Sequence, residues 1–210
     1  MQETEEALSD DAHSLLRRLE RVEAIQEIEK LQSRYCHYLL KHEYDRIVDD
    51  CFVHLTDDVS VEFSDSGVYR GQDKIRQLYS EFNTLKNLPG FFILHTTVNP
   101  YIVLAADGQS AKSSWLSPGC SGRSSSATWI WGVFYVDYRK ERGRWRIQHT
   151  NFAPIFRNPY EVSWARAENH GSVRTFSFPP DAPPTVYRPY SELKNQPDIF
   201  SHHPKLPEPF

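Results

Sequence analysis

Two histidines lie in segments whose other residues suit β-strands. His95 lies in FFILHTTVNP (residues 91–100) and His149 in RWRIQHTNF (residues 144–152), each among apolar and β-branched side chains. Imidazole titrates near pH 6.5 when unperturbed, so a histidine held within about 3 Å of a substrate proton is a natural general base. A histidine in such a strand is also often a structural group with a satisfied hydrogen bond. The direction in which each side chain faces decides between these two roles.

Alternation along a strand predicts which residues share a face with each imidazole. His95 shares its face with Ile93, and His149 shares its face with Ile147 and Asn151. If both faces line one cavity, two imidazoles and the Asn151 amide project into an apolar pocket.

Other side chains that could assist acid–base chemistry lie before the first of these strands. Tyr35 and Tyr38 are three residues apart on a helical pattern, so they lie close to one face, although helix spacing alone is more typical of core aromatics. Glu62 and Arg70 flank a hairpin turn. A buried Glu62 carboxylate would need a cationic partner, and Arg70 could supply it or could simply hold the hairpin.

The elements that must position these groups follow from hydrophobic periodicity. Three- and four-residue spacing from Leu15 through Ile28 to Tyr35 predicts a long helix over about 13–41, and shorter helices are expected in 42–52 and from about Asp73. The segment 59–71 reads as two short strands around a turn. Further strands are expected at 91–98, 100–106, 109–117, 128–138 and 143–152. This order predicts an α+β fold, a curved mixed β-sheet forming a cone with three N-terminal helices over its concave face.

The order of these elements also suggests the domain boundaries. Residues 1–12 are expected to be a frayed acidic N-terminus, 13–156 the cone domain, and 157–210 a proline-rich arm lying on the domain or on a neighbouring subunit. The run SPGCSGRSSS (117–126) has no apolar anchor, so it is either a mobile lid or a plain disordered connection.

Composition excludes several classes of function. The net charge of −4 argues against nucleic-acid binding, and no apolar run approaches the ~20 residues of a membrane span. The acidic N-terminus lacks the apolar core of a signal peptide, and the three cysteines lack metal-binding spacing, so we expect a cytoplasmic protein with reduced thiols. No phosphate-binding glycine loop, serine elbow or paired-histidine helix is present, and no cofactor or metal is implied.

Four segments together resemble a known family. They are AIQEIEKLQSRYCHYLLKHEYDRIVDDCF, VSVEF with VYRGQDKIRQLYSEF, FILHTTVNPYIVLAADGQSAKSSWL and WGVFYVDYRKERGRWRIQHTNF. In this order they resemble the SnoaL-like branch of the nuclear-transport-factor-2-like superfamily, over about residues 15–155. The branch includes scytalone dehydratase, bile acid 7α-dehydratase and cofactor-free diarylpropane lyases. The fold also hosts cyclases, isomerases and noncatalytic subunits.

The resemblance transfers to individual positions only in part. His95 matches a histidine of the dehydratases, and Tyr35 matches a tyrosine of the bile acid enzyme. Leu40 stands where the dehydratases keep an aspartate, and Trp115 stands where scytalone dehydratase has a second histidine. Glu62 falls near a tyrosine that the dehydratases use. Because both members of the Asp–His pair are apolar here, the resemblance does not imply a copy of the scytalone mechanism.

These observations lead to one functional hypothesis and two alternatives. We expect a cofactor-independent lyase, acting by dehydration or by carbon–carbon elimination such as deformylation, on a hydrophobic hydroxylated aromatic or polycyclic small molecule. His95 would be the general base, assisted by Tyr35 and Arg70, with His149 and Glu62 as further candidates. The expected substrate-binding residues are Tyr38, Leu40, Phe63, Trp115 and Asn151. The alternatives are an isomerase or cyclase that uses Glu62, and a noncatalytic subunit like the dioxygenase β-subunit. A homo-oligomer, dimer or trimer, is expected.

Overall fold

The computed structural model describes residues 2–165, 176–185, 195 and 203–210, with side chains described from residue 11 on. Within this part the chain forms three helices, α1 (Gln2–Leu40), α2 (Tyr44–Cys51) and α3 (Gln72–Leu85). The same described residues form seven strands, β1 (Ser60–Phe63), β2 (Gly67–Arg70), β3 (Phe92–His95), β4 (Val98–Leu104), β5 (Ser110–Arg123), β6 (Ser126–Glu141) and β7 (Arg144–Pro159).

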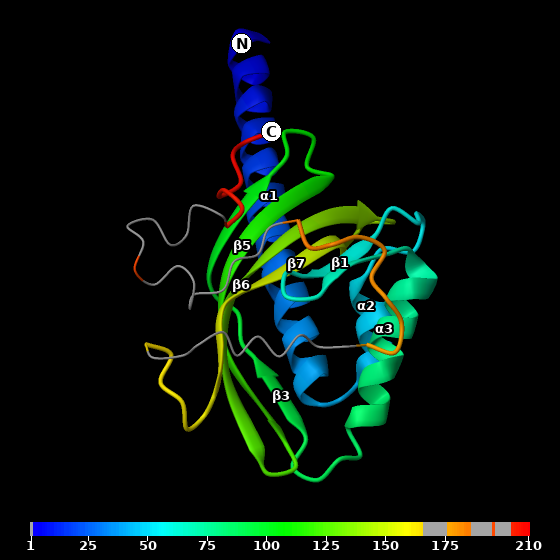
Figure 1. Ribbon diagram of the computed structural model, residues 1–210. Coiled ribbons are helices and arrows are strands. Elements are labelled where there is room, and N and C mark those ends of the chain that lie inside the picture. Colours follow the sequence, from blue (N-terminus) through cyan, green and yellow to red (C-terminus); the bar gives the residue numbers. More distant parts are fainter. Residues whose placement is uncertain (1, 166–175, 186–194, 196–202) are drawn as a thin grey trace.

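The strands form one mixed sheet in the order β2-β1-β7-β6-β5-β3, with β4 also paired to β5. Only the β1–β7 pairing is parallel among the described strands. Figure 1 shows the long strands curving around the helices, which lie on one side of the sheet. The expected α+β cone with three helices over its concave face is therefore confirmed.

The Ser/Gly-rich run at 117–126 is not a loop. Residues 117–123 belong to β5 and pair in register with β6, so that Gly119 lies opposite Ile130. A Cβ on Gly119 would lie 2.5 Å from the Leu94 carbonyl oxygen, so only glycine lets the β3 backbone approach this closely. The absence of large side chains here reflects close backbone packing, and neither a lid nor a disordered connection forms.

The two short helices bury the faces that their spacing predicts. Buried side chains of α2 are Tyr44, Ile47, Val48 and Cys51, and those of α3 are Ile75, Leu78, Tyr79 and Phe82. The expectation for α1 is only half right. Ile28 and Tyr35 are buried, but Leu15 and Val22 are exposed, and the helix begins at Gln2 where a frayed end was expected.

Residues 176–185, one of the described parts of the proline-rich region, are called the C-terminal arm below. It runs along β2 and α3 (Figure 1). The Val68 N–H donates to the Ala182 carbonyl at 3.0 Å, which adds a bridge to the sheet edge. Phe176 and Phe178 pack edge-on against Tyr69, with ring centroids 5.4 and 5.7 Å away. This part of the region lies on the chain's own domain.

None of the described helices combines the length and the apolar character that a membrane crossing requires.

Candidate active site

The sheet has an inner face, which faces the helices, and an outer face. Phe134 and Tyr138 on β6 mark the inner face, because both reach helix α1. The ring centroids of Phe134 and Tyr35 lie 5.9 Å apart, and the Tyr138 hydroxyl donates a hydrogen bond to Gln32 Oε1 at 3.0 Å. Residues directly opposite each other on paired strands share a face. Strand register therefore assigns a face to every candidate residue on the sheet.

His95 lies on the inner face. It pairs with Gly119, which pairs in turn with inner-facing Ile130. The imidazole packs edge-on against Phe152 and Phe134, at centroid distances of 4.7 and 6.0 Å, and its Nδ1 lies 3.5 Å from the Ser117 hydroxyl. Two aromatic rings and a hydroxyl thus hold the ring plane of His95.

A small cavity of about 30 Å³ adjoins this imidazole. Its walls are Phe63, Asp65, Ile93, His95, Ser121, Ile130, Phe152 and Arg157. Asp65 and Arg157 form an ion pair at 3.0 Å, with side chains 3% and 15% exposed. Asp65 Oδ1 and Arg157 Nε are buried and have no hydrogen-bond partner among the described residues. Buried polar atoms without partners beside a cavity can bind a polar ligand group.

Sequence reasoning missed both members of this ion pair. Asp65 was read as part of a hairpin turn, where aspartate is common for local reasons. Arg157 was assigned to the proline-rich arm, but β7 continues to Pro159 and pairs Arg157 with Ile130. No local signal distinguishes an aspartate that bonds its own turn from one that reaches a distant arginine.

The expectation that His149 and Asn151 face the cavity is wrong. Gln148 is unpaired between the Ile147–Tyr138 and His149–Asp137 pairs, which makes a β-bulge. Ile147 therefore faces inward, whereas His149 and Asn151 turn to the outer face. His149 lies 3.0 Å from the Ser60 hydroxyl through Nδ1 and 3.7 Å from the Asp58 carboxylate through Nε2.

Glu62 also lies on the outer face, because it pairs with Asn151. Its carboxylate accepts hydrogen bonds from the Thr185 N–H and hydroxyl, both at 2.8 Å, and so binds the C-terminal arm. Arg70 is exposed, and its backbone N–H donates to Asp181 Oδ2 at 2.8 Å. Within the described part of the chain Glu62 and Arg70 form no ion pair, so both belong to the attachment of the arm.

Tyr35 and Phe63 are near the cavity. Phe63 is part of its wall. Tyr35 contacts the same Phe134 ring as His95, but its hydroxyl is hydrogen-bonded to the Tyr79 hydroxyl at 2.9 Å. Burial raises the pKa of Tyr79 well above its ordinary value, which keeps that phenol protonated.

Trp115 is inner-facing but lies in a separate buried network. Its Nε1 donates to Ser113 Oγ at 2.6 Å and to the Tyr138 hydroxyl at 3.1 Å. This network joins the sheet to Gln32 of α1. Trp115 is not among the residues that line the cavity beside His95.

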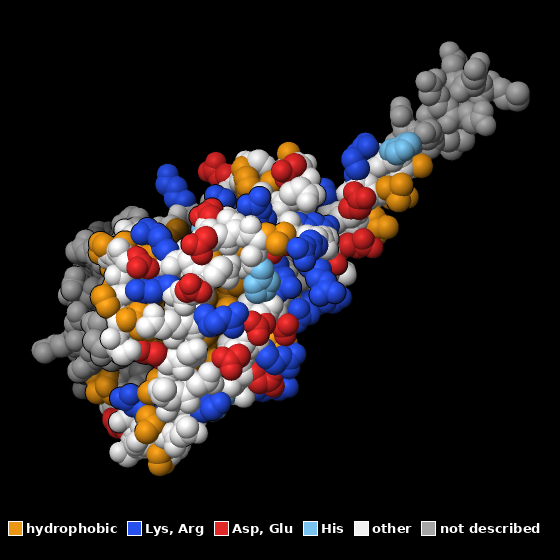
Figure 2. Space-filling view, turned by 90° about the vertical axis from the view of Figure 1, so that its right-hand side faces the viewer, with side chains coloured by type: hydrophobic (Ala, Val, Ile, Leu, Met, Phe, Trp, Pro, Cys, Tyr) orange, Lys and Arg blue, Asp and Glu red, His pale blue; other side chains and the backbone are white. Residues whose placement is uncertain are grey.

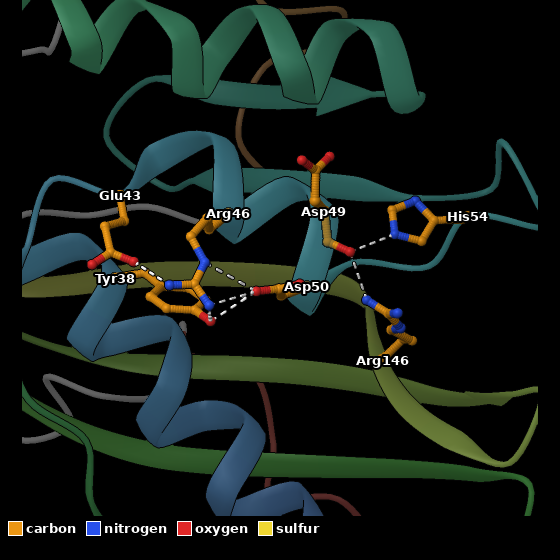
Figure 3. A network of polar contacts seen from close by, with 7 residues as sticks. All are labelled: Tyr38, Glu43, Arg46, Asp49, Asp50, His54 and Arg146. Atoms are coloured by element: carbon orange, nitrogen blue, oxygen red, sulfur yellow. Dashed lines mark hydrogen bonds and ion pairs between the residues drawn. The ribbon is translucent and has the colours of Figure 1, made fainter.

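Tyr38 and Leu40 lie away from the cavity, which corrects their expected role as substrate-binding residues. Leu40 is 43% exposed at the end of α1. Tyr38 donates to Asp50 Oδ2 at 2.7 Å, and Arg46 lies 4.4 Å over its ring. Figure 3 shows this network, in which the Asp49 carbonyl also accepts a hydrogen bond from Arg146 of β7. It fastens α2 to its neighbours.

Among the residues that the structure describes, no three His, Cys, Asp or Glu side chains are grouped as a metal site would require.

Comparisons with known proteins agree on the fold. The family model of the SnoaL-like domain matches residues 20–151. A search of curated proteins found no match.

Three solved structures illustrate the likeness. A protein provisionally named scytalone dehydratase from Novosphingobium aromaticivorans has 14% identity and a TM-score of 0.59, covering 69% of this chain and 92% of its own. The type-3 hexachlorocyclohexane dehydrochlorinase of Novosphingobium barchaimii has 15% identity and a TM-score of 0.58, with coverages of 70% and 96%. A nuclear-transport-factor-2-like protein with a cystatin-like fold, from N. aromaticivorans, has 16% identity and a TM-score of 0.55, with coverages of 77% and 96%.

Proposed function

Because the chain belongs to the SnoaL-like domain family, we propose that it is a cofactor-independent lyase acting on a hydrophobic, hydroxylated aromatic or polycyclic molecule. The observation that carries this proposal is the inner-face cavity, where the His95 imidazole and the buried Asp65–Arg157 ion pair lie among apolar walls. Two of the similar structures are named for eliminations, a dehydratase and a dehydrochlorinase, which agrees with this reaction class.

His95 is the proposed general base. In a dehydration, it takes a proton from the carbon beside the one that bears the hydroxyl, and the electron pair of the C–H bond forms the double bond. Hydroxide departs and recovers the proton from the imidazolium as water. In a deformylation, His95 takes the proton of a hydroxymethyl O–H, and the C–C bond breaks to release formaldehyde. The electron pair of that bond forms the double bond, while hydroxide leaves the neighbouring carbon and takes the proton of the imidazolium to become water.

Arg157 takes the role that the sequence suggested for Tyr35 and Arg70. A guanidinium in a dry cavity stabilises the negative charge that develops on a substrate oxygen. Asp65 is a positioning residue, because it holds Arg157 at 3.0 Å and offsets the cost of burying the cation. The arginine Nε that lacks a partner in the described structure supplies a hydrogen bond to that oxygen.

The size of the cavity requires part of its wall to move before a ring system enters. About 30 Å³ holds a water-sized group, whereas sites for drug-sized ligands are on the order of 300–1,000 Å³. Phe63 in the wall stacks on Phe176 of the C-terminal arm, with ring centroids 5.9 Å apart. Displacement of the arm, which would free the Phe63 ring, is the opening that we propose.

The small volume also favours a second candidate, a noncatalytic subunit. In that case the inner-face groups would serve packing, and a partner protein would supply the chemistry. An isomerase based on Glu62 has less support, because that carboxylate binds Thr185 on the outer face.

The two candidates are separated by titrating wild-type protein with hydroxylated diaryl and steroid-like compounds, following binding by tryptophan fluorescence and products by mass spectrometry. His95→Ala should abolish turnover, and His149→Ala is the matched control, because it removes an outer-face imidazole. Arg157→Gln should lower kcat, while Arg157→Lys should retain part of it. Equal turnover by wild type and His95→Ala would remove His95 from the mechanism, and absence of binding to all proteins would favour the noncatalytic subunit.

A further inference from the structure

Helix α1 carries apolar side chains on two opposite faces. Ile28 is fully buried against the domain and lies nine residues after Leu19. Nine residues are about two and a half turns at 3.6 residues per turn, so Leu19 points away from the side that the domain covers. One continuous helix thus presents one apolar face to its own sheet and another to the opposite side.

The outward face is strongly exposed. Leu15, Leu16, Leu19 and Val22 are 64%, 56%, 51% and 52% exposed. Figure 1 shows that the N-terminal part of α1 projects beyond the sheet, and Figure 2 shows hydrophobic side chains along this projecting rod, between charged ones. Because the domain lies on the other side of the helix, it cannot cover this face.

The spacing of these residues is that of a coiled-coil seam. Ala12, Leu15, Leu19 and Val22 follow steps of three, four and three residues, which places them at alternating a and d positions of a heptad. The outward face then becomes polar, with Gln26, Glu29, Ser33 and His37. The seam therefore ends about where the domain begins.

The charges beside the seam fit a second copy of the same helix. Arg18 occupies a g position and Glu23 the next e position, the two places that meet across a parallel pair. In an antiparallel pair that stacks Leu15 on Leu19 of the other copy, the two Arg18 side chains would face each other. The charge pattern therefore selects the parallel arrangement.

We propose that the outward face of α1, Ala12 to Val22, forms a parallel two-stranded coiled coil with the same face of a second copy of this chain. The two domains then lie on the far sides of the helix pair, so they do not collide. The seam is short, but it continues a helix that packs on the domain from Ala24 onward, so pairing does not have to nucleate a new helix.

Sedimentation equilibrium of the full chain tests this pairing. The wild type should be a concentration-dependent dimer, and Leu15→Glu with Leu19→Glu should weaken the dimer by at least about 100-fold, because it removes four leucines from the seam. Leu55→Glu with Leu88→Glu is the matched control, since both leucines are exposed elsewhere, at 59% and 37%. Circular dichroism and thermal unfolding verify that every variant folds.

Charge reversal tests the direction of pairing. Arg18→Glu should weaken the dimer by about tenfold, and adding Glu23→Arg should restore it. A wild type that remains monomeric at about 100 µM, well above the dissociation constants of specific complexes, would overturn the proposal. A dimer that survives the double leucine substitution, or one that Arg18→Glu strengthens, would overturn it equally.

Discussion

Removal of the Asp65 charge should destabilise the protein strongly. Asp65→Asn keeps the shape of the side chain but leaves the Arg157 guanidinium, 15% exposed, without its carboxylate at 3.0 Å. Breaking a buried ion pair by removing one partner costs about 3–5 kcal/mol, which is a large part of a total stability of roughly 5–15 kcal/mol. With a urea slope of about 2 kcal/mol per M, the unfolding midpoint should fall by about 2 M.

The assay is equilibrium urea unfolding of four proteins: wild type, Asp65→Asn, Arg157→Gln and the double variant. The double variant should recover part of the lost free energy of unfolding, because neither charge is left buried without a partner. The double-mutant cycle then measures the coupling energy of the two side chains. Glu43→Gln is the control. Its ion pair with Arg46 is shorter, at 2.7 Å, but the side chains are 33% and 58% exposed, so its loss should cost less than about 1 kcal/mol.

One result would refute this reasoning. If Asp65→Asn costs no more than Glu43→Gln, the cation is solvated in solution and the ion pair is not a buried element of the cavity. The proposed role of Arg157 in stabilising substrate charge would then lose its physical basis, since a hydrated guanidinium gains little from the site.

Three further predictions concern other buried groups. Burial raises the pKa of Asp137, so its ionised form opposes folding. Asp137→Asn should therefore raise the free energy of unfolding at pH 7. Urea titrations should show this gain in stability vanishing below the carboxyl's unfolded pKa of about 3.9. Burial raises the pKa of Cys51 to about 12, so a thiol reagent at pH 8 should label it only after denaturant is added, as timed absorbance measurements would show. A Cβ at Gly132 would lie 2.7 Å from the Phe152 ring and from the Ala153 carbonyl oxygen, so Gly132→Ala should cost about 1–3 kcal/mol in a thermal melt.

The sequence was sufficient to predict the elements whose hydrophobic spacing is regular. Helices α2 and α3 bury the predicted faces, and the inward direction of His95 follows from simple alternation on a four-residue strand. For α1 the periodicity was correct but its interpretation was not. Leu15, Leu19 and Val22 belong to a different face from Ile28, and three-residue steps drift around a helix of 3.6 residues per turn.

The rest of the candidate site depends on contacts between distant parts of the chain. Asp65 meets Arg157 only after β1 pairs with β7, and nothing near either residue indicates that contact. Glu62 was a catalytic candidate because it flanks the hairpin and falls near a tyrosine that the dehydratases use, yet its partner Thr185 lies in the arm. Bulges are a second feature that could not be predicted from the sequence, because they depend on how two strands pair and leave little trace in composition.

The first bulge of β7 shifts the alternation of its side chains between the two faces of the sheet, and the second bulge restores it. Gln148 shifts the alternation by one residue, and Ile155, unpaired between Pro154 and Phe156, shifts it back. Outside the two bulges the inward-facing residues are odd-numbered, as Ile147 and Arg157 are. Between the bulges they are even-numbered, as Thr150 and Phe152 are. Deleting Gln148 alone would remove the first bulge but leave Ile147 opposite Tyr138 and His149 opposite Asp137, so Phe152 would still face the cavity. The unpaired position of Gln148 in β7 is thus what places Thr150 and Phe152 on this wall of the pocket and keeps His149 and Asn151 off it.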